Sequence, residues 1–420
     1  MRNELSDRQQ AIRMRLAGDT ISLICQALRR SDAWVRKWWQ RYLAAGGEGL
    51  YDLTRAHSNL IQRTPAHIER AILAIRRRLA AHATPQTRYA LVGAATIREE
   101  LHALGFSPVP TLRTIDRILH RANLTSPRVR LAPRLPQTAY PGPQAHDSNQ
   151  IHQVDLVGPR YLSGRKTKYY FFVCKDAFDQ SVYAEFHAGK EMDLVLPFLI
   201  HAWQHLGLPQ SVQFDNGRQF YSSGRWERSL NRVIRLCLRL GVQPIFIPEA
   251  HPERNGSVEN FNGWFQPLLL RRPFRNASAV RHELRRLVLT TNEQHVHQVL
   301  GFRTPLQYRR GKRIHKLPAT FALNFDAIPV AAGKITFIRW VPAHGYVDVL
   351  GESVKVGRRL RYRYIKLTVE THTSSENLPQ RTFAQTAHIQ TASWLTPKRY
   401  DDLTVTKSSN RYIGHLSYRQ

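Results

Sequence analysis

The sequence has few cysteines, few acidic residues and no long apolar run. Its three cysteines, Cys25, Cys174 and Cys237, lie far apart and show no CxxC spacing, which excludes a disulfide framework and a cysteine-based zinc site. There is no run of about 18 apolar residues and no leader with a charged start and an apolar middle. We therefore expect neither membrane insertion nor secretion, and a reducing cytoplasmic environment.

Basic residues outnumber acidic ones two to one. Lys and Arg number 62 against 31 Asp and Glu in 420 residues, which gives a net charge of +31. The basic residues form clusters along the whole chain, at 76–78, 271–272, 309–313 and 358–363. A solvated basic surface explains any one cluster, but the total charge and its spread suit an extended polyanion. We expect double-stranded DNA as the partner of a protein with about three globular domains.

The first 60 residues contain three short segments with helical periodicity, at 7–16, 21–28 and 32–44. Ser31 is the expected N-cap of the third helix. On that helix an apolar stripe at i, i+3, i+4 spacing is formed by Val35, Trp38 and Trp39. Three cations lie largely off the stripe: Arg36, Lys37 and Arg41. This pattern predicts a helix-turn-helix domain at 1–60 whose cations contact DNA. A plain helical bundle is the alternative.

A second helical domain is predicted at 61–125, with helices at 68–80, 94–104 and 112–122. The last helix carries an arginine every four residues, at Arg113, Arg117 and Arg121. One arginine face suits the DNA backbone, and a solvated face fits equally well. Residues 126–147 contain five prolines and no apolar periodicity, which predicts a linker.

Strand and helix patterns alternate in the region 148–315. Strands are expected at 151–157, 169–174, 181–186, 211–214 and 242–247, and helices at 191–206, 225–240, 256–270 and 278–294. This order predicts an α/β domain. Short segments rich in Val, Ile, Tyr and Arg follow between 331 and 369, and we expect a small β-barrel domain at 316–372. Residues 373–420 form a tail without an assigned structure.

Three carboxylates stand out in the α/β region. Asp155 lies within Gln-Val-Asp-Leu-Val, where a charge among residues that favour burial is costly unless something pairs with it. Asp215 closes a strand before Asn-Gly and should point into the crevice at the carboxyl end of the sheet. Glu259 lies near the start of a helix, off the apolar stripe of that helix, and should face a cleft.

Together these carboxylates predict a metal site. Oxygen ligands suit Mg²⁺, with Mn²⁺ as a substitute, and two such ions stabilise the attacking and leaving oxygens of a phosphoryl displacement. Asp155, Asp215 and Glu259 are therefore the predicted catalytic residues and metal ligands. Each alone has a simpler explanation: Asp155 as a buried paired acid, Asp215 as a turn former and Glu259 as a helix-dipole partner.

Four segments resemble the catalytic core of the DDE transposases and retroviral-type integrases: His152–Pro159, Phe214–Gly217, His251–Phe261 and Leu300–Pro305. The resemblance implies a ribonuclease-H-like fold with Asp155 on the first strand, Asp215 after the fourth and Glu259 on the following helix. With the helical domains before it and the β-domain after it, the chain is similar to bacterial insertion-sequence transposases over about residues 5 to 370.

The sequence departs from this family in its spacing. The step from Asp155 to Asp215 is 60 positions and that from Asp215 to Glu259 is 44, longer than is usual, with the extra length expected in 221–232. Glu249 and Glu253 are rivals for the third acid, although Val-Glu-Asn-Phe on a helix favours Glu259. No His/Cys zinc module like that of retroviral integrases is present, so the helix-turn-helix domains would recognise DNA ends.

Three polar residues near Glu259 complete the predicted site. Asn255 lies in the loop before the catalytic helix and Asn262 lies about one turn past Glu259, and we expect both to contact DNA. His251 is expected to contact a phosphate or the attacking water, or to be a plain surface histidine.

The resemblance implies a transposase that binds the terminal inverted repeats of a mobile DNA element through residues 1–125. Such an enzyme uses water to free a 3′ hydroxyl and then joins that hydroxyl to target DNA, as a homo-oligomer on DNA in the bacterial nucleoid. The alternatives are a helix-turn-helix regulator with a relic catalytic core, and a plain nuclease that cuts without joining.

Overall fold

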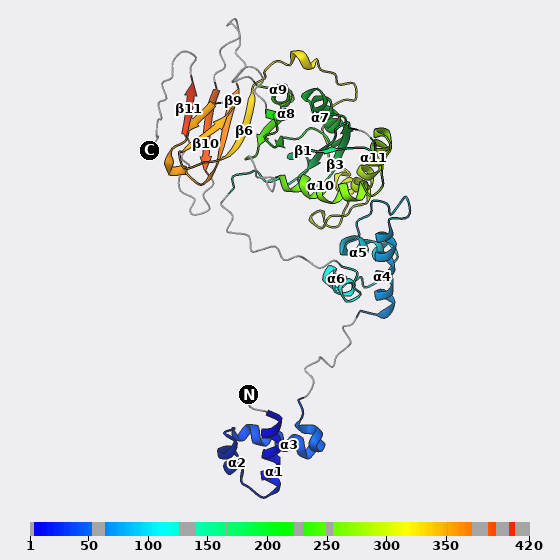
Figure 1. Cartoon of the computed structure of the whole chain (residues 1–420), viewed down its shortest axis with the longest axis vertical. Coiled ribbons are helices and arrows are strands. Elements are labelled where there is room, and N and C mark those ends of the chain that lie inside the picture. The colour runs from blue at the N-terminus through cyan, green and yellow to red at the C-terminus, as the bar shows by residue number, and fades with distance from the viewer. Residues whose placement is uncertain are drawn as a thin grey trace. The chain divides into compact units, whose positions relative to one another are not determined.

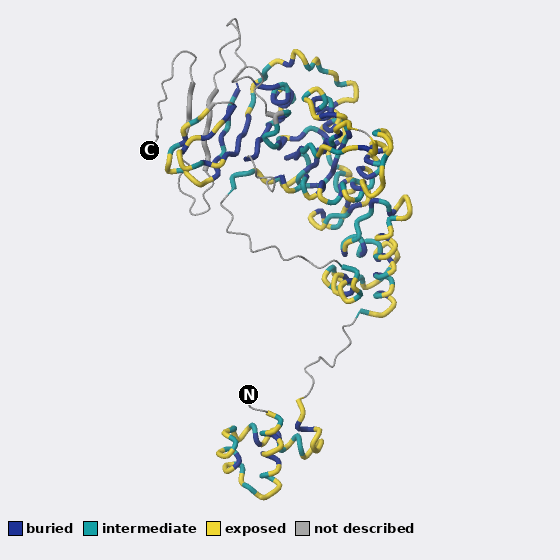
Figure 2. Tube along the Cα trace, viewed as in Figure 1, coloured by how far each residue is buried: buried dark blue, intermediate teal, exposed yellow. Residues whose placement is uncertain are grey.

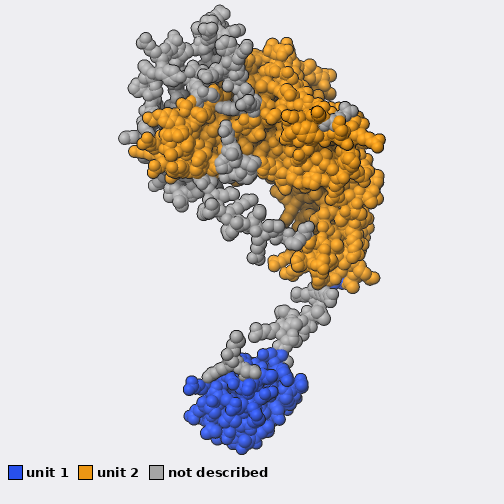
Figure 3. Space-filling model, in the orientation of Figure 1, with its two compact units in different colours: residues 1–65 blue, residues 66–420 orange. Residues whose placement is uncertain are grey.

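The computed structural model describes residues 4–52, 64–125, 140–164, 166–221, 230–248, 255–350, 352–371, 385–391 and 403–407 (Figure 1). The chain divides into two compact units, Met1–Pro65 and Ala66–Gln420 (Figure 3). The domain boundary expected at residue 60 and most of the expected linker, 126–139, lie outside the described residues.

In its described part, 4–52, the first unit contains three helices and a short 3-10 turn: α1 (Glu4–Leu16), α2 (Ile21–Leu28), α3 (Asp32–Ala45) and η1 (Gly46–Leu50). Ser31 caps α3, because its side chain accepts a hydrogen bond from the Trp34 backbone N–H. On α3, Val35 and Trp38 are buried as the stripe predicts, whereas Trp39 is only partly buried. Arg8 of α1 lies over Trp38 at 3.9 Å and donates to the Leu50 carbonyl, which fastens η1 to α1.

The second unit begins with three helices that share an apolar core: α4 (Ala66–Ala81), α5 (Ala94–Ala103) and α6 (Leu112–Arg121). The loop between α4 and α5 fixes this bundle to the rest of the unit. Arg88 forms an ion pair of 2.9 Å with Glu283, the buried Tyr89 donates its hydroxyl to the same carboxylate, and His295 bonds to the Tyr89 carbonyl at 2.7 Å.

A nine-stranded sheet forms the centre of the second unit, in the order β11-β10-β9-β6-β5-β4-β1-β2-β3 (Figure 1). Its strands are β1 (Ile151–Arg160), β2 (Tyr169–Asp176), β3 (Val182–His187), β4 (Ser211–Phe214), β5 (Gln243–Phe246), β6 (Gly333–Trp340), β9 (Tyr364–Thr371), β10 (Gln385–Thr391) and β11 (Leu403–Lys407). The first three strands form an antiparallel meander, and β1, β4, β5 and β6 pair in parallel.

Helices cover both faces of the sheet: α7 (Met192–Leu206), α8 (Arg218–Tyr221), α9 (Arg232–Arg239), α10 (Gly256–Leu269), α11 (Ala277–Gln294) and α12 (Pro305–Arg309). On β2, Phe172 packs in the cluster that contains α7 and α9, whereas its neighbour Phe171 packs in the cluster that contains α10 and α11. Strands covered on both faces read as continuous apolar runs, and the central strands are mostly buried (Figure 2). Across the described residues, no helix has the length and apolar character for a membrane crossing.

The small β-barrel predicted at 316–372 is not what the described strands form. β6 pairs in parallel with β5 and antiparallel with β9, so both strands extend the central sheet. Only β7 (Tyr346–Val349) and β8 (Glu352–Lys355) form a separate hairpin. The sequence pattern predicts strands but not which strands pair. Without β6, β5 would be an edge strand with unpaired backbone groups, and β6 pairs with them. β10 and β11 lie in the tail that the sequence left without structure, and they pair with β9 and with each other.

One arginine joins α12 to the turn after β2. Arg309 donates to Asp179 at 2.6 Å, to Asp176 at 3.0 Å and to the side chain of Asn149 at 3.1 Å. Both aspartates are fully buried. Burying a carboxylate is costly unless an opposite charge and hydrogen bonds satisfy it. The segment 300–305 begins α12 with the Thr304 cap. It therefore helps to position Arg309 next to the two buried aspartates.

We predict that Arg309→Ala destabilises the second unit by about 3–5 kcal/mol, because it leaves two buried carboxylates without their cation. Thermal unfolding of the full chain should show the transition of this unit lowered by about 10 °C. Arg310→Ala, which removes the exposed neighbouring arginine, is the matched control and should leave the transition in place. Equal melting temperatures for the two variants would contradict the assigned role.

Candidate active site

Two aspartates lie side by side at the carboxyl edge of the parallel strands. In the register of β1 and β4, Gln153 stands opposite Gln213. Asp155 and Asp215 each follow two residues later, so the pairing of the strands brings both carboxylates to the same level. This edge is where α/β sheets usually place their functional groups.

The two carboxylates share a poorly hydrated site. Burial and, second, the negative charge of Asp215 raise the pKa of Asp155 to about 6, against the hydrogen bonds that Asp155 accepts. Burial also raises the pKa of Asp215, while the Gly217 N–H, 2.9 Å from its Oδ1, and the charge of Lys190 act in the opposite direction. The site therefore holds two like charges whose repulsion nothing in the described residues fully relieves.

Asn262 of α10 holds the first aspartate. Its Nδ2 donates to Asp155 Oδ2 at 2.6 Å, and the side chain is only 7% exposed. Its Oδ1 is buried with no hydrogen-bond partner in the described part of the chain. In this structure the side chain orients a carboxylate, and the DNA contact expected for Asn262 stays a prediction.

The start of α10 is fastened to β1 and β2. Gln153 Oε1 accepts hydrogen bonds from the backbone N–H groups of Ser257 and Val258, at 3.0 and 3.1 Å. The buried Lys175 of β2 donates to the Ser257 carbonyl at 3.0 Å. The two N–H groups lie in the first turn of the helix and have no partner within it, so Gln153 satisfies them, and together with Lys175 it fixes the first turn of α10 against the sheet.

Asn255, the residue before α10, lies inside the protein. It is 3% exposed, donates to the Val154 carbonyl at 3.2 Å and accepts from Gln213 at 3.2 Å. We expected a DNA contact from its loop position, but here the amide connects β1 and β4. Sequence analysis also missed Gln153 and Gln213. Their signal is a polar residue two positions before each aspartate, on the same face of an otherwise apolar strand.

Glu259 lies in the first turn of α10 and is half-buried. Among the residues that the structure describes, no three His, Cys, Asp or Glu side chains are arranged to hold a metal ion. The structure thus brings Asp155 and Asp215 together but does not bring Glu259 into one ligand group with them. Glu249, His251 and Glu253 lie outside the described residues.

The donor set fits a hard divalent cation. Asp155 and Asp215 offer carboxylate oxygens from neighbouring strands, and burial together with the negative charge of Asp215 raises the pKa of Asp155. Such oxygens are the ligands that Mg²⁺ prefers, and a cation between them would lower both pKa values.

The cations predicted to bind DNA differ in their surroundings. Lys37 is exposed, whereas Arg36 pairs with Asp32 on its own helix and Arg41 donates to the Tyr51 carbonyl at 2.7 Å. On α6, Arg113 and Arg117 are exposed with no ion pair among the described residues. The third arginine of that face, Arg121, pairs with Glu69 at 2.8 Å.

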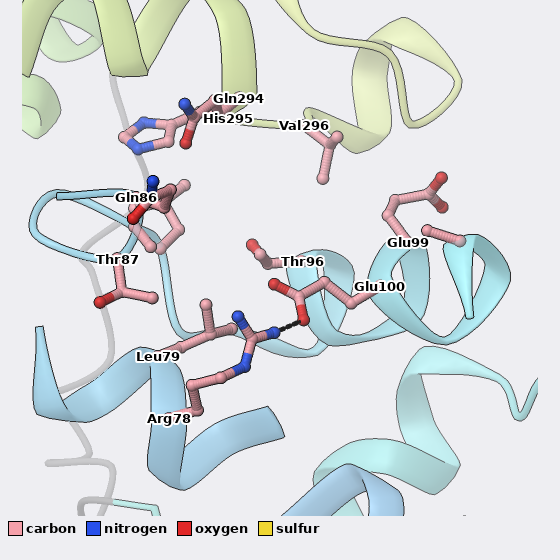
Figure 4. Close-up of a pocket in the computed structure, with 13 residues that line it drawn as sticks. Arg78, Leu79, Gln86, Thr87, Thr96, Glu99, Glu100, Gln294, His295 and Val296 are labelled. Atoms are coloured by element: carbon pink, nitrogen blue, oxygen red, sulfur yellow. Dashed lines mark hydrogen bonds and ion pairs between the residues drawn. The ribbon is translucent and has the colours of Figure 1, made fainter. Parts of the chain in front are cut away.

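A separate pocket of about 290 Å³ lies where the α4–α6 bundle meets the segment after α11 (Figure 4). It is lined by the ion pair of Arg78 and Glu100, by Thr87 and by His295. None of the predicted catalytic residues lines it, so it is distinct from the aspartate pair.

We predict that Asp155→Asn stabilises the metal-free protein at pH 8. The folded-state pKa of about 6 lies above the ordinary 3.8, so the ionised form costs up to about 3 kcal/mol above pH 6, and this cost disappears as the pH falls through 6 toward 4. Melting in EDTA should show the variant more stable than the wild type at pH 8 and equal to it at pH 4. Asp193→Asn, on an exposed position, is the control. A variant less stable at pH 8 contradicts the electrostatic account.

We also predict that Gln153→Ala loosens the start of α10. Two backbone N–H groups lose an acceptor, each bond contributing about 1 kcal/mol, so amide exchange at Ser257 and Val258 should accelerate by about tenfold. Hydrogen exchange measured by NMR or mass spectrometry checks this. Gln204→Ala, which removes a hydrogen bond from α7 to the Pro318 carbonyl, should leave α10 unchanged. Unaltered exchange in Gln153→Ala argues against the capping role.

Comparison with known proteins identifies two domains. Residues 145–252 match the model of the integrase core domain, and residues 7–57 match that of a helix-turn-helix domain. The first match contains β1 to β5 with Asp155 and Asp215, and the second contains most of α1 and all of α2 and α3. The helix-turn-helix domain predicted near the N-terminus and the predicted integrase core are thus confirmed.

Three retroviral structures are among the solved structures to which the chain is similar, all with low TM-scores. The HTLV-2 integrase catalytic core domain in complex with magnesium is 21% identical, covering 40% of this chain and 100% of that one, with a TM-score of 0.31. The simian T-cell lymphotropic virus intasome in complex with PP2A regulatory subunit B56 gamma is 18% identical over 68% and 93%, with a TM-score of 0.34. The BIV integrase catalytic core domain is 17% identical over 38% and 93%, with a TM-score of 0.30.

The assignment rests on the two domain matches, which cover the aspartate pair and the N-terminal helices. The chain contains an integrase core domain with a helix-turn-helix domain ahead of it.

Proposed function

We propose that the protein is a transposase that binds the terminal inverted repeats of a mobile DNA element, cleaves at the 3′ ends and transfers the freed strands into target DNA. The observation that carries the proposal is the pair of half-buried aspartates at one edge of the integrase core, with the pKa of Asp155 raised to about 6. A site that concentrates unrelieved negative charge is built for cations, and phosphoryl transfer proceeds by positioning and electrostatic stabilisation.

Asp155 and Asp215 would hold Mg²⁺, for which Mn²⁺ would substitute, and Glu259 is proposed as the third catalytic ligand. When bound, two such ions stabilise charge on the attacking and leaving oxygens of the phosphate. Support for Glu259 comes from its position in the first turn of α10, the turn that Gln153 and Lys175 fasten to the sheet. Glu259 has to approach the aspartate pair for a complete ligand set.

The surrounding residues orient the ligands and the DNA. Asn262 holds Asp155 by a short hydrogen bond, so one carboxylate oxygen is fixed in place before a substrate arrives. Preorganised groups of this kind lower the cost of reaching the transition state. Asp155 and Asp215 would serve both cleavage, with water as the nucleophile, and strand transfer, with the 3′ hydroxyl as the nucleophile.

DNA ends would be bound by the two helical domains. The proposed contacts are Arg36, Lys37 and Arg41 on α3, Arg113, Arg117 and Arg121 on α6, and Asn262 on α10. The exposure of Lys37, Arg113 and Arg117 supports direct phosphate contacts. Because two ends have to be joined in one reaction, we propose a homo-oligomer on DNA in the bacterial nucleoid.

The test is Asp155→Asn assayed on DNA that carries the inverted repeats flanking the gene, with Mg²⁺. We expect loss of cleavage and strand transfer by at least about a thousandfold, as for removal of a group that acts in the transition state, while end binding stays unchanged. Asp193→Asn should retain both activities.

Three outcomes separate the alternatives. Strand transfer retained in Asp155→Asn contradicts the proposal. Tight end binding by a wild-type protein that neither cuts nor joins indicates a helix-turn-helix regulator with a relic core. Cutting without joining indicates a nuclease.

A further inference from the structure

A cluster of exposed rings and arginines lies at one end of the strands that follow the integrase core. We name it the aromatic–arginine patch, formed by Tyr346, Arg358, Arg359, Arg361, Tyr362 and Arg363. The tyrosine side chains are 38% and 55% exposed, and the four arginines are exposed. None of these arginines has an ion pair among the described residues, and residues 339–366 contain seven Lys and Arg against one Asp and one Glu.

Backbone hydrogen bonds bring the two parts of the patch together. The Tyr362 N–H donates to the Val341 carbonyl at 2.7 Å, and the Val356 and Gly357 N–H groups both donate to the Gly345 carbonyl, at 2.9 and 3.1 Å. Gly345 has no room for a side chain, since a Cβ there would lie 2.9 Å from the Arg358 nitrogen. The turn that carries Tyr346 therefore sits directly against the turn that carries the arginines.

Packing in the core does not explain Tyr362, and the half-exposed Tyr346 has its ring 5.9 Å from that of His344, between centroids. Trp340 and Tyr364, in the neighbouring register pair, have ring centroids 4.9 Å apart, and the buried Tyr364 also meets Tyr140. Tyr362 instead projects to solvent from a backbone with φ of 61°, a conformation that bulky residues rarely adopt. The Arg361 guanidinium lies 6.0 Å from the centroid of its ring.

We propose that the aromatic–arginine patch binds an unpaired DNA strand, with Tyr346 and Tyr362 stacking on bases and the arginines contacting phosphates. Arginines alone would suit a duplex, but base faces are available for stacking only where bases are unpaired, and stacking is largely independent of sequence. The proposal rests on the proposed function only in taking DNA as the substrate, and it assigns this patch the single-stranded part of that DNA.

The test compares binding of a mixed-sequence single strand and of its blunt duplex to the full-length protein, by fluorescence anisotropy. Tyr346→Ala/Tyr362→Ala should weaken binding of the single strand by about tenfold or more, and leave duplex binding unchanged. Tyr346→Phe/Tyr362→Phe keeps both rings and should restore single-strand affinity. Arg358→Ala/Arg361→Ala should weaken binding of both the single strand and the duplex. It should also lower the salt dependence of binding, because fewer counterions are released.

A second measurement locates the strand. Photo-crosslinking with 5-iododeoxyuridine in the single strand should label Tyr346 or Tyr362, as mapped by mass spectrometry. Equal losses on single strand and duplex in the tyrosine variant, or crosslinks confined to other regions, would overturn the proposal and leave a duplex-binding surface. Because neither assay requires catalysis, an inactive wild-type protein that still shows the tyrosine effect would contradict only the proposed transposase activity.

Discussion

Electrostatic repulsion between two desolvated carboxylates is the constraint on which the centre of the molecule depends. The parallel pairing of β1 with β4 fixes Asp155 and Asp215 at one level, and burial keeps the pKa of Asp155 near 6. Keeping two buried carboxylates close together lowers the free energy of unfolding. Interactions elsewhere in the unit therefore have to offset this cost. The double-sided packing of the sheet and the buried ion pairs of Arg309 do so at a distance from the site.

Helix α10 connects this strained pair to the rest of the second unit. Its first turn is capped by Gln153, its next turn presents Asn262 to Asp155, and its apolar face packs with α11. Trp264 on the same helix contacts His295, which bonds to the Tyr89 carbonyl in the loop between α4 and α5. One helix thus joins the aspartate pair, the core beneath it and the bundle proposed to hold DNA.

Local features of this fold could be predicted from the sequence, and partners could not. The strand at 211–214 and the Ser31 cap were predicted correctly because both depend on neighbouring residues. The pairing of β5 with β6 was missed, and a barrel was expected instead, because the two strands are far apart in the chain. For the same reason Asn255 was expected at the DNA surface, although its partners on β1 and β4 bury it. Asp155 could be found as a charge within an apolar strand and Asp215 as an acid that closes a strand, whereas the position of Glu259 depends on how α10 docks.

The continuous sheet also sets a fixed length within the molecule. β9, which begins next to the aromatic–arginine patch, lies four strands from β1 in the order β9-β6-β5-β4-β1, about 19 Å at a spacing of about 4.8 Å per strand. A flexible linker would allow the distance between β1 and β9 to vary, whereas the hydrogen-bonded strands between them keep it constant. The sheet therefore behaves as a molecular ruler between the aspartate pair and the strands beyond the core.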